Sequence, residues 1–132
     1  MLNCGDTFLT GDEDDPENYH LWIVITPPSE GEVVTVCVTT RRQKSETLVV
    51  LRSGEHPFID RESVIAYKHS KIRTVADIES AIRNKTAKHR EPATESLLKR
   101  VQNGLMDSDH TPNGIKHFYK GIRDENAAKA KE

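Results

Sequence analysis

Cysteine is scarce in this sequence, with only Cys4 and Cys37 among 132 residues. Two cysteines do not make a disulfide framework. Cys37 lies in an apolar segment, where a free cysteine packs as a small hydrophobic residue. Cys4 has no neighbouring cysteine or histidine at a zinc-site spacing. We therefore expect no disulfide scaffold, no metal and no cofactor.

Long apolar runs and a secretion signal are also missing. No apolar run approaches the roughly 20 residues that a membrane-spanning helix needs. The segment Met1–Asp6 has neither the basic nor the apolar stretch of a signal peptide. These absences predict a cytoplasmic protein with no membrane segment.

Familiar catalytic and metal motifs are absent too. The sequence holds no Gly-rich phosphate loop, no HExxH and no GxSxG. Its six histidines show no paired metal spacing, and the acidic stretch Asp12–Asp15 lacks the glycine and the spaced ligands of a calcium loop. No short motif therefore identifies the chemistry.

What is present is an uneven distribution of charge. The chain carries 19 Lys and Arg residues against 21 Asp and Glu residues. The first 40 residues hold eight of the acids and no Lys or Arg, so residues 41–132 have a net charge of +6. A nearly neutral protein of this kind can present a basic face that attracts phosphate. An ordinary mixed surface beside an acidic loop would have the same composition.

Apolar, β-branched segments separated by turn residues predict an antiparallel sheet in the first half of the chain. The expected strands are 6–9, 20–26, 33–40, 47–51 and 63–69. The stretch Thr10–Tyr19 is too polar to pack and is expected to be a mobile acidic loop. No helical pattern intervenes, so a small antiparallel β-barrel or a bent sheet is expected.

The pattern changes at Thr74, a hydroxyl N-cap followed by Asp77 at the third helical position. Further helices are expected from near Pro92 to Gly104 and from Thr111-Pro112 onward. The expected organisation is one α+β domain, with a β-barrel over 1–73, a helical extension packed on it over 74–122, and a frayed tail over 123–132.

The first strands resemble a known family. The chain opens with a Gly5-Asp6-Thr7-Phe8 strand, a long loop and the apolar strand 20–26. A turn and the strand 33–40, which ends in hydroxyl residues, follow. This order of segments is similar to the opening of MazF/PemK proteins. The similarity covers roughly residues 5–72. It implies an SH3-like barrel, commonly a homodimer, that cleaves single-stranded RNA without a metal and pairs with a protein antitoxin.

The resemblance also implies where the catalytic residues lie. The family places an Arg at the start of the second strand, where this sequence has His20, and a hydroxyl after the third strand, which Thr39, Thr40, Ser45 or Thr47 would supply. Histidine, with an unperturbed pKa of about 6.5, suits proton transfer, but it is a weaker permanent phosphate clamp than Arg.

Six residues are candidates for RNA contacts: Arg41, Arg42, Lys44, His56, Tyr67 and Lys68. The Arg41–Lys44 segment follows a strand end and would bind phosphate, although a solvated turn would look the same. His56 lies in a loop beside a proline, where binding residues collect. Tyr67 and Lys68 offer a stacking surface and a cation at a strand end, and His69 beside them is a second potential cation, although Tyr67 could equally belong to the core.

Three functions follow from these observations. The protein could be an endoribonuclease toxin of the MazF/PemK type, or the same barrel used as a non-catalytic binding module for RNA or a protein. It could also be an interaction protein whose helices dock a partner. The sequence leaves open whether the chain cleaves RNA.

Overall fold

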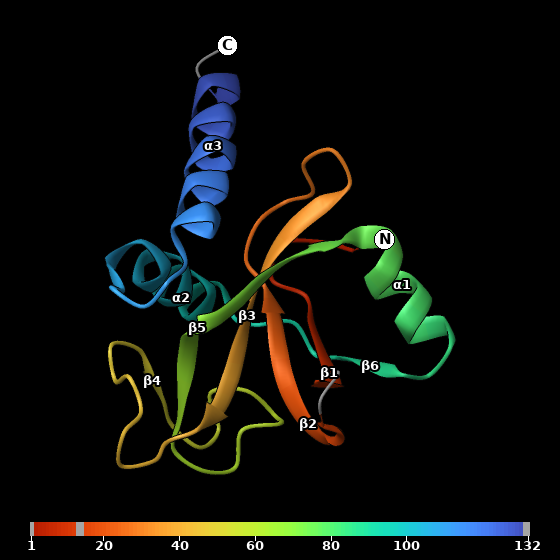
Figure 1. Cartoon of the computed structure of the whole chain (residues 1–132), viewed down its shortest axis with the longest axis vertical. Helices are drawn as coiled ribbons and strands as arrows, with labels where there is room; N and C mark the ends of the chain where they lie inside the picture. Colours follow the sequence, from red (N-terminus) through yellow and green to blue (C-terminus); the bar gives the residue numbers. More distant parts are fainter. Residues whose placement is uncertain (1, 13–14, 131–132) are drawn as a thin grey trace.

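Six strands form one curled sheet in the computed structural model, which describes residues 2–12 and 15–130. The strand order is β4-β5-β3-β2-β1-β6, and all these neighbours pair antiparallel. The sheet curls into a half-barrel, and three helices complete the fold (Figure 1). This confirms the α+β class predicted from the sequence.

The strands are β1 (Thr7–Asp12), β2 (Asp15–Val24), β3 (Glu32–Thr40), β4 (Val50–Leu51), β5 (Ser63–Thr74) and β6 (Ala87–Arg90). The helices are α1 (Val75–Arg83), α2 (Glu95–Asp107) and α3 (Asn113–Ala130). The predicted N-cap is confirmed, because the Thr74 hydroxyl accepts the Asp77 backbone N–H at 3.0 Å. Thr94 caps α2 in the same way, through the Leu97 backbone N–H.

The loop expected over Thr10–Tyr19 is wrong for the residues that the structure describes. They extend β1 and β2 into a longer antiparallel pair, in which Gly11 faces Tyr19 and Asp12 faces Asp15. Residues 13–14 lie outside the described ranges. The ladder is built from backbone groups, so a polar stretch can pair once the apolar strands beside it have set the register.

The segment 74–122, expected to be helical, also contains a strand, because β6 lies within it. It pairs with β1, from Thr7 opposite Arg90 to Thr10 opposite Ala87. Gly104 does not end a helix, since α2 continues to Asp107. The tail expected to fray is helical as far as Ala130.

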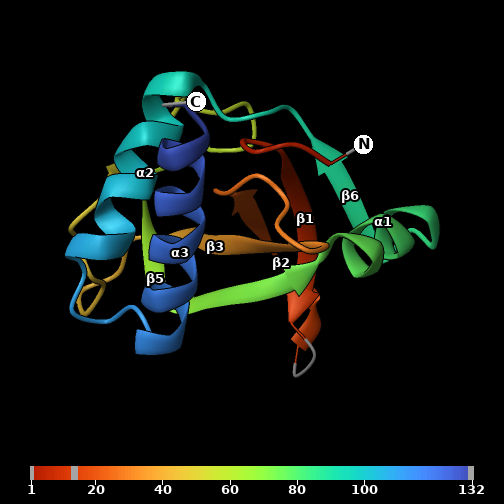
Figure 2. The same cartoon turned by 90° about the horizontal axis from the view of Figure 1, so that it is seen from above.

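The sheet buries apolar side chains on both faces. One cluster joins Ile23, Val36 and Tyr67 of the sheet to Leu97 and Val101 of α2. The other cluster contains Phe8, Trp22 and Cys37 and receives Ile78 from α1 and Ala87 from β6. Helices α2 and α3 thus lie at one side of the sheet and α1 at the opposite end of the molecule (Figure 2).

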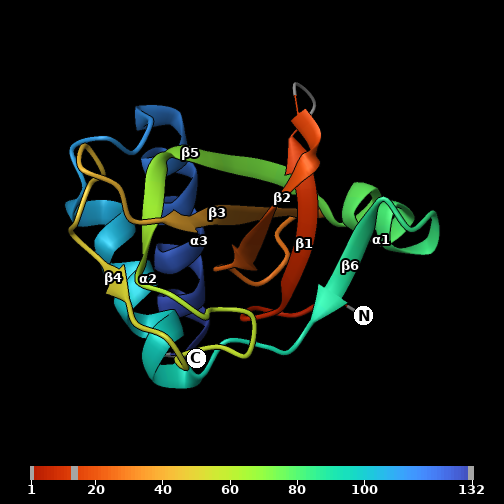
Figure 3. The ribbon, with the colours of Figure 1, turned by 90° about the horizontal axis from the view of Figure 1, so that it is seen from below.

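Strand β5 turns a corner, which Figure 3 shows from below. Its pairing with β3 shifts register there: Cys37 faces Ala66, but Thr35 faces Lys71. The stretch from Ala66 to Lys71 therefore forms a bulge, a feature that bends a strand and redirects its side chains. Lys68 and His69 lie on this bulge and are exposed.

No helix within the described ranges is both long enough and apolar enough to cross a membrane.

Candidate functional site

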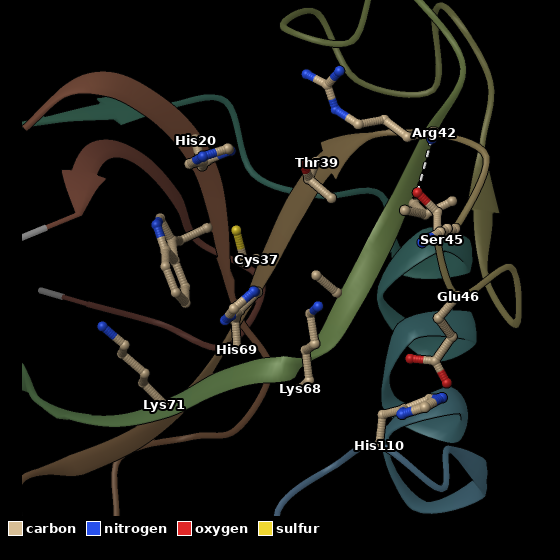
Figure 4. A pocket seen from close by; sticks show the side chains of 14 residues that line it. His20, Cys37, Thr39, Arg42, Ser45, Glu46, Lys68, His69, Lys71 and His110 are labelled. Atoms are coloured by element: carbon tan, nitrogen blue, oxygen red, sulfur yellow. Dashed lines mark hydrogen bonds between the residues drawn. The ribbon is translucent and has the colours of Figure 1, made fainter. Parts of the chain in front are cut away.

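A cavity of about 680 Å³ opens over the part of the sheet where β2, β3 and β5 lie side by side (Figure 4). We call it the basic cavity. Its lining residues are His20, Trp22, Cys37, Thr39, Arg42, Lys44, Ser45, Glu46, Val64, Ala66, Lys68, His69, Lys71 and His110. A cavity of this size falls in the range of ordinary ligand sites.

The floor of the basic cavity follows from strand register. Trp22 of β2 pairs with Cys37 of β3, and Cys37 pairs with Ala66 of β5. Residues directly opposite one another on neighbouring strands share a face of the sheet. This row therefore forms a continuous apolar floor. Thr39, two residues beyond Cys37 on β3, adds a hydroxyl on the same face.

Two polar segments rise around this floor. The loop after β3 supplies Arg42, Lys44, Ser45 and Glu46. This loop is held by its own hydrogen bonds, because the Arg42 N–H donates to Ser45 Oγ at 2.8 Å (dashed in Figure 4). Glu46 ties the loop to the end of α2 by accepting the Ser108 hydroxyl.

The bulge of β5 forms the other wall. It presents Lys68, His69 and Lys71, all exposed. The Lys71 ammonium lies 5.8 Å from the centre of the Trp22 ring, and the Arg73 guanidinium lies 4.4 Å from it. These cation–π contacts place positive charge above the apolar floor.

The cavity is strongly cationic. Arg42, Lys44, Lys68 and Lys71 line it against a single acid, Glu46. Among the described residues, none of these four cations forms an ion pair with an acid. Within that part of the chain, no direct ion pair offsets their charge, and this arrangement attracts anions.

Three histidines complete the lining, namely His20 from β2, His69 from the bulge and His110 from the connection between α2 and α3. Histidine is the side chain best suited to accept or donate a proton near neutral pH. A cavity holding several histidines and unpaired cations can therefore bind a phosphate and move protons beside it. Within the described residues, no three His, Cys, Asp or Glu side chains lie close enough together to hold a metal ion.

A second, smaller cavity of about 300 Å³ adjoins the first. We call it the aromatic cavity. Its lining residues are Tyr19, His20, Val38, Thr39, Thr40, Arg42, Phe58, Ile59, Asp60, Arg61 and Ser63. His20, Thr39 and Arg42 line both cavities.

The structure brings together most of the candidate residues that the sequence indicates. His20, Thr39, Arg42, Lys44 and Lys68 all line the basic cavity. Of the remaining candidates for the hydroxyl, Thr40 lines the aromatic cavity, Ser45 lines the basic cavity and Thr47 lines neither. Arg41 also lines neither cavity, because its guanidinium pairs with Glu62 at the surface.

Two expected contact residues are buried instead, which corrects their assignment. His56 is 2% exposed, and its Nε2 lies 2.6 Å from the Glu91 carbonyl oxygen. Tyr67 is fully buried, and its hydroxyl donates to the Val101 carbonyl oxygen at 2.8 Å. Burial raises the pKa of Tyr67 above its ordinary range, and the nearby Glu46 and Asp107 carboxylates raise it further. Tyr67 is therefore a core residue that holds α2 on the sheet.

Three lining residues, Lys71, Glu46 and His110, are not predicted by the sequence pattern. The apolar alternation that marks β5 ends at His69, so it does not indicate that the strand continues to Lys71. Glu46 and His110 carry no local signal, because only the packing of α2 beside the loop after β3 brings them to the cavity.

No protein-family model matches this chain, and no curated protein sequence matches it significantly. The resemblance to MazF/PemK proteins therefore stays a prediction.

Proposed function

We propose that this protein binds single-stranded RNA in the basic cavity and cleaves it without a metal, as a ribonuclease of the MazF/PemK type. The single observation that supports this most is the set of four Lys and Arg side chains, unpaired among the described residues, around a cavity that also holds three histidines. A phosphodiester needs positive charge beside it and proton transfer at two of its oxygens.

Arg42, Lys44, Lys68 and Lys71 hold the phosphate in this proposal. They come from the loop after β3 and from the bulge of β5, so they approach the floor from two sides. The Arg guanidinium offers a planar fork to the phosphate oxygens, while the Lys ammonium groups act as point charges. Thr39 lies on the floor between these groups and donates a hydrogen bond to the same phosphate.

His20 and His69 transfer the protons. One histidine accepts the proton of the ribose 2′-hydroxyl, and the 2′-oxygen attacks the adjacent phosphorus. The bond from phosphorus to the 5′-oxygen breaks, and that oxygen takes a proton from the other histidine. The products are a 2′,3′-cyclic phosphate and a 5′-hydroxyl, and the step requires no oxidant, reductant or metal.

The wider biological role that the resemblance implies is part of the same proposal. A MazF/PemK-type ribonuclease acts as a homodimeric toxin held in check by a protein antitoxin. A non-catalytic module that binds RNA in the same cavity is the alternative, and the cleavage experiment separates the two.

The test uses a short single-stranded RNA with a fluorescent label, with EDTA present throughout. Binding is measured by anisotropy over a salt series, and cleavage is measured by product analysis. The Arg42→Ala/Lys68→Ala variant should bind more weakly and flatten the log–log salt slope, by about 0.7 for each phosphate that the variant no longer neutralises. Lys120→Ala is the matched control, because Lys120 is exposed on α3 and lines neither cavity.

His20→Ala and His69→Ala should each abolish cleavage while leaving RNA affinity close to wild type. His117→Ala is the control, because His117 is exposed on α3. An RNA with 2′-deoxyribose at the cleaved position should bind and stay intact. Absence of RNA binding by the wild type would refute the proposal, and binding without cleavage would leave only the non-catalytic alternative.

A further inference from the structure

Two exposed aromatic rings lie at the edge of the aromatic cavity. Four large hydrophobic side chains are prominently exposed among the described residues, and Tyr19 (57% exposed) and Phe58 (39% exposed) are the two aromatic ones. Both line this cavity, although they come from β2 and from the segment between β4 and β5. Exposed rings are costly in water, and two of them at one cavity indicate a surface for an apolar or aromatic ligand group.

The aromatic cavity adjoins the basic cavity. His20, Thr39 and Arg42 line both, so a ligand bound in one lies against residues of the other. In a single strand of RNA, each phosphate links two nucleotides, so a sugar with its base follows on both sides of it. A base next to a phosphate held by Arg42 therefore lies within reach of the aromatic cavity.

The segment that carries Phe58 is held in place by the buried His56. The Phe58 backbone N–H donates to His56 Nδ1 at 3.0 Å, and the Ile59 N–H donates to the His56 carbonyl oxygen at 2.9 Å. Because His56 Nδ1 accepts, Nε2 carries the proton and donates to the Glu91 carbonyl oxygen. The Phe58 side chain has a contact of its own, because the Arg90 guanidinium lies 5.8 Å from the centre of its ring. The backbone that carries the ring is thus held in place, and a backbone fixed before binding lowers the entropic cost of binding.

We propose that the aromatic cavity is a subsite for one unpaired nucleobase, next to the phosphate bound in the basic cavity, with Tyr19 and Phe58 as its stacking rings. Stacking on aromatic side chains is a general way in which proteins hold single-stranded nucleic acid. Thr40 also lines this cavity, and its hydroxyl would meet the polar rim of the base. This inference rests on the proposed RNA binding.

The experiment compares an intact single-stranded RNA with an abasic RNA of the same length, which keeps the phosphates and lacks the bases. To prevent cleavage, both carry 2′-deoxyribose at the cleaved position. Wild-type protein should bind the intact strand about 5- to 100-fold more tightly than the abasic strand. Phe58→Ala and Tyr19→Ala should remove most of this preference without changing the salt slope, because neither ring contacts phosphate. Phe58→Trp should restore the preference.

Leu48→Ala is the matched control, since Leu48 is 49% exposed and lines neither cavity. Circular dichroism of every variant checks that the fold is retained. Equal affinity of the wild type for intact and abasic RNA would refute the base subsite and leave the phosphate site standing. An unchanged preference in folded Phe58→Ala and Tyr19→Ala would also refute it. Failure to bind either strand would refute this inference and the proposed function together.

Discussion

Gly104 lies where α2 packs tightly against the Tyr67 side chain. A Cβ atom at this position would lie 2.7 Å from Val49 Cγ2 and closer still to the Tyr67 hydroxyl. Tyr67 also bonds to the Val101 carbonyl, one turn earlier on the same helix. The absent side chain therefore lets the Tyr67 ring lie against α2, which explains a glycine inside a helix, where glycine is ordinarily unfavourable.

Gly104→Ala should destabilise the protein by about 1–3 kcal/mol, because the methyl group overpacks a site that is already full. Gly121→Ala is the matched control, since nothing lies within 4 Å of its added Cβ on α3. That variant should be neutral or more stable by up to about 1 kcal/mol. Urea denaturation measures both changes. Equal effects of the two substitutions would show that the contact with Tyr67 does not limit this position.

At the scale of elements, α3 has buried side chains in the first part of the helix and exposed ones further along it. Ile115, Tyr119 and Ile122 are buried, whereas residues 123–126 are exposed. The helix therefore packs through its first part. The polar composition of residues 123–132 predicts a frayed tail, but helical backbone needs no apolar side chains to continue once its first turns are docked.

Truncation after Arg123 should therefore lower the melting temperature by less than about 4 °C, which corresponds to a loss below about 1 kcal/mol. Truncation after His117 removes Tyr119 and Ile122 and should lower it much further, because both side chains are buried. Thermal unfolding followed by circular dichroism compares the two. A similar large drop for both would show that the end of α3 contributes packing of its own.

At the scale of the whole molecule, the sheet connects all three helices. Tyr67, Leu97 and Val101 belong to one cluster on the sheet, and Trp22 and Ile78 belong to the other. Neighbouring sheet residues such as Leu21 and Trp22 contribute to opposite clusters, since successive side chains of a strand point to opposite faces. Loss of either cluster therefore exposes the same strands.

The chain should consequently unfold in one cooperative transition. Trp22 is the sole tryptophan and lies in the sheet, so its fluorescence reports the sheet, while circular dichroism at a helical wavelength reports the helices. The two urea transitions should coincide in midpoint and slope. Loss of the helical signal at a lower urea concentration would show that the helices dock as a separate unit.

Local chemistry in the sequence predicts the fold class and much of the secondary structure. The β-branched runs around β2 and β3 favour strands, and the hydroxyl of Thr74 caps α1 through a contact three residues away. His20, Thr39 and the basic segment after β3 are candidates from sequence because strand ends and loops are where binding residues collect. These signals act over a few residues and can be read directly from the chain.

Tertiary structure alone decided how distant segments meet. Strand β6 pairs with β1 although most of the chain separates them in sequence, and the bulge that turns Lys68, His69 and Lys71 toward the cavity arises from the register between β3 and β5. The fold also buried His56 and Tyr67, whose residue types equally suit an RNA surface. Register and burial depend on packing between segments far apart in the chain, and no short sequence pattern specifies them.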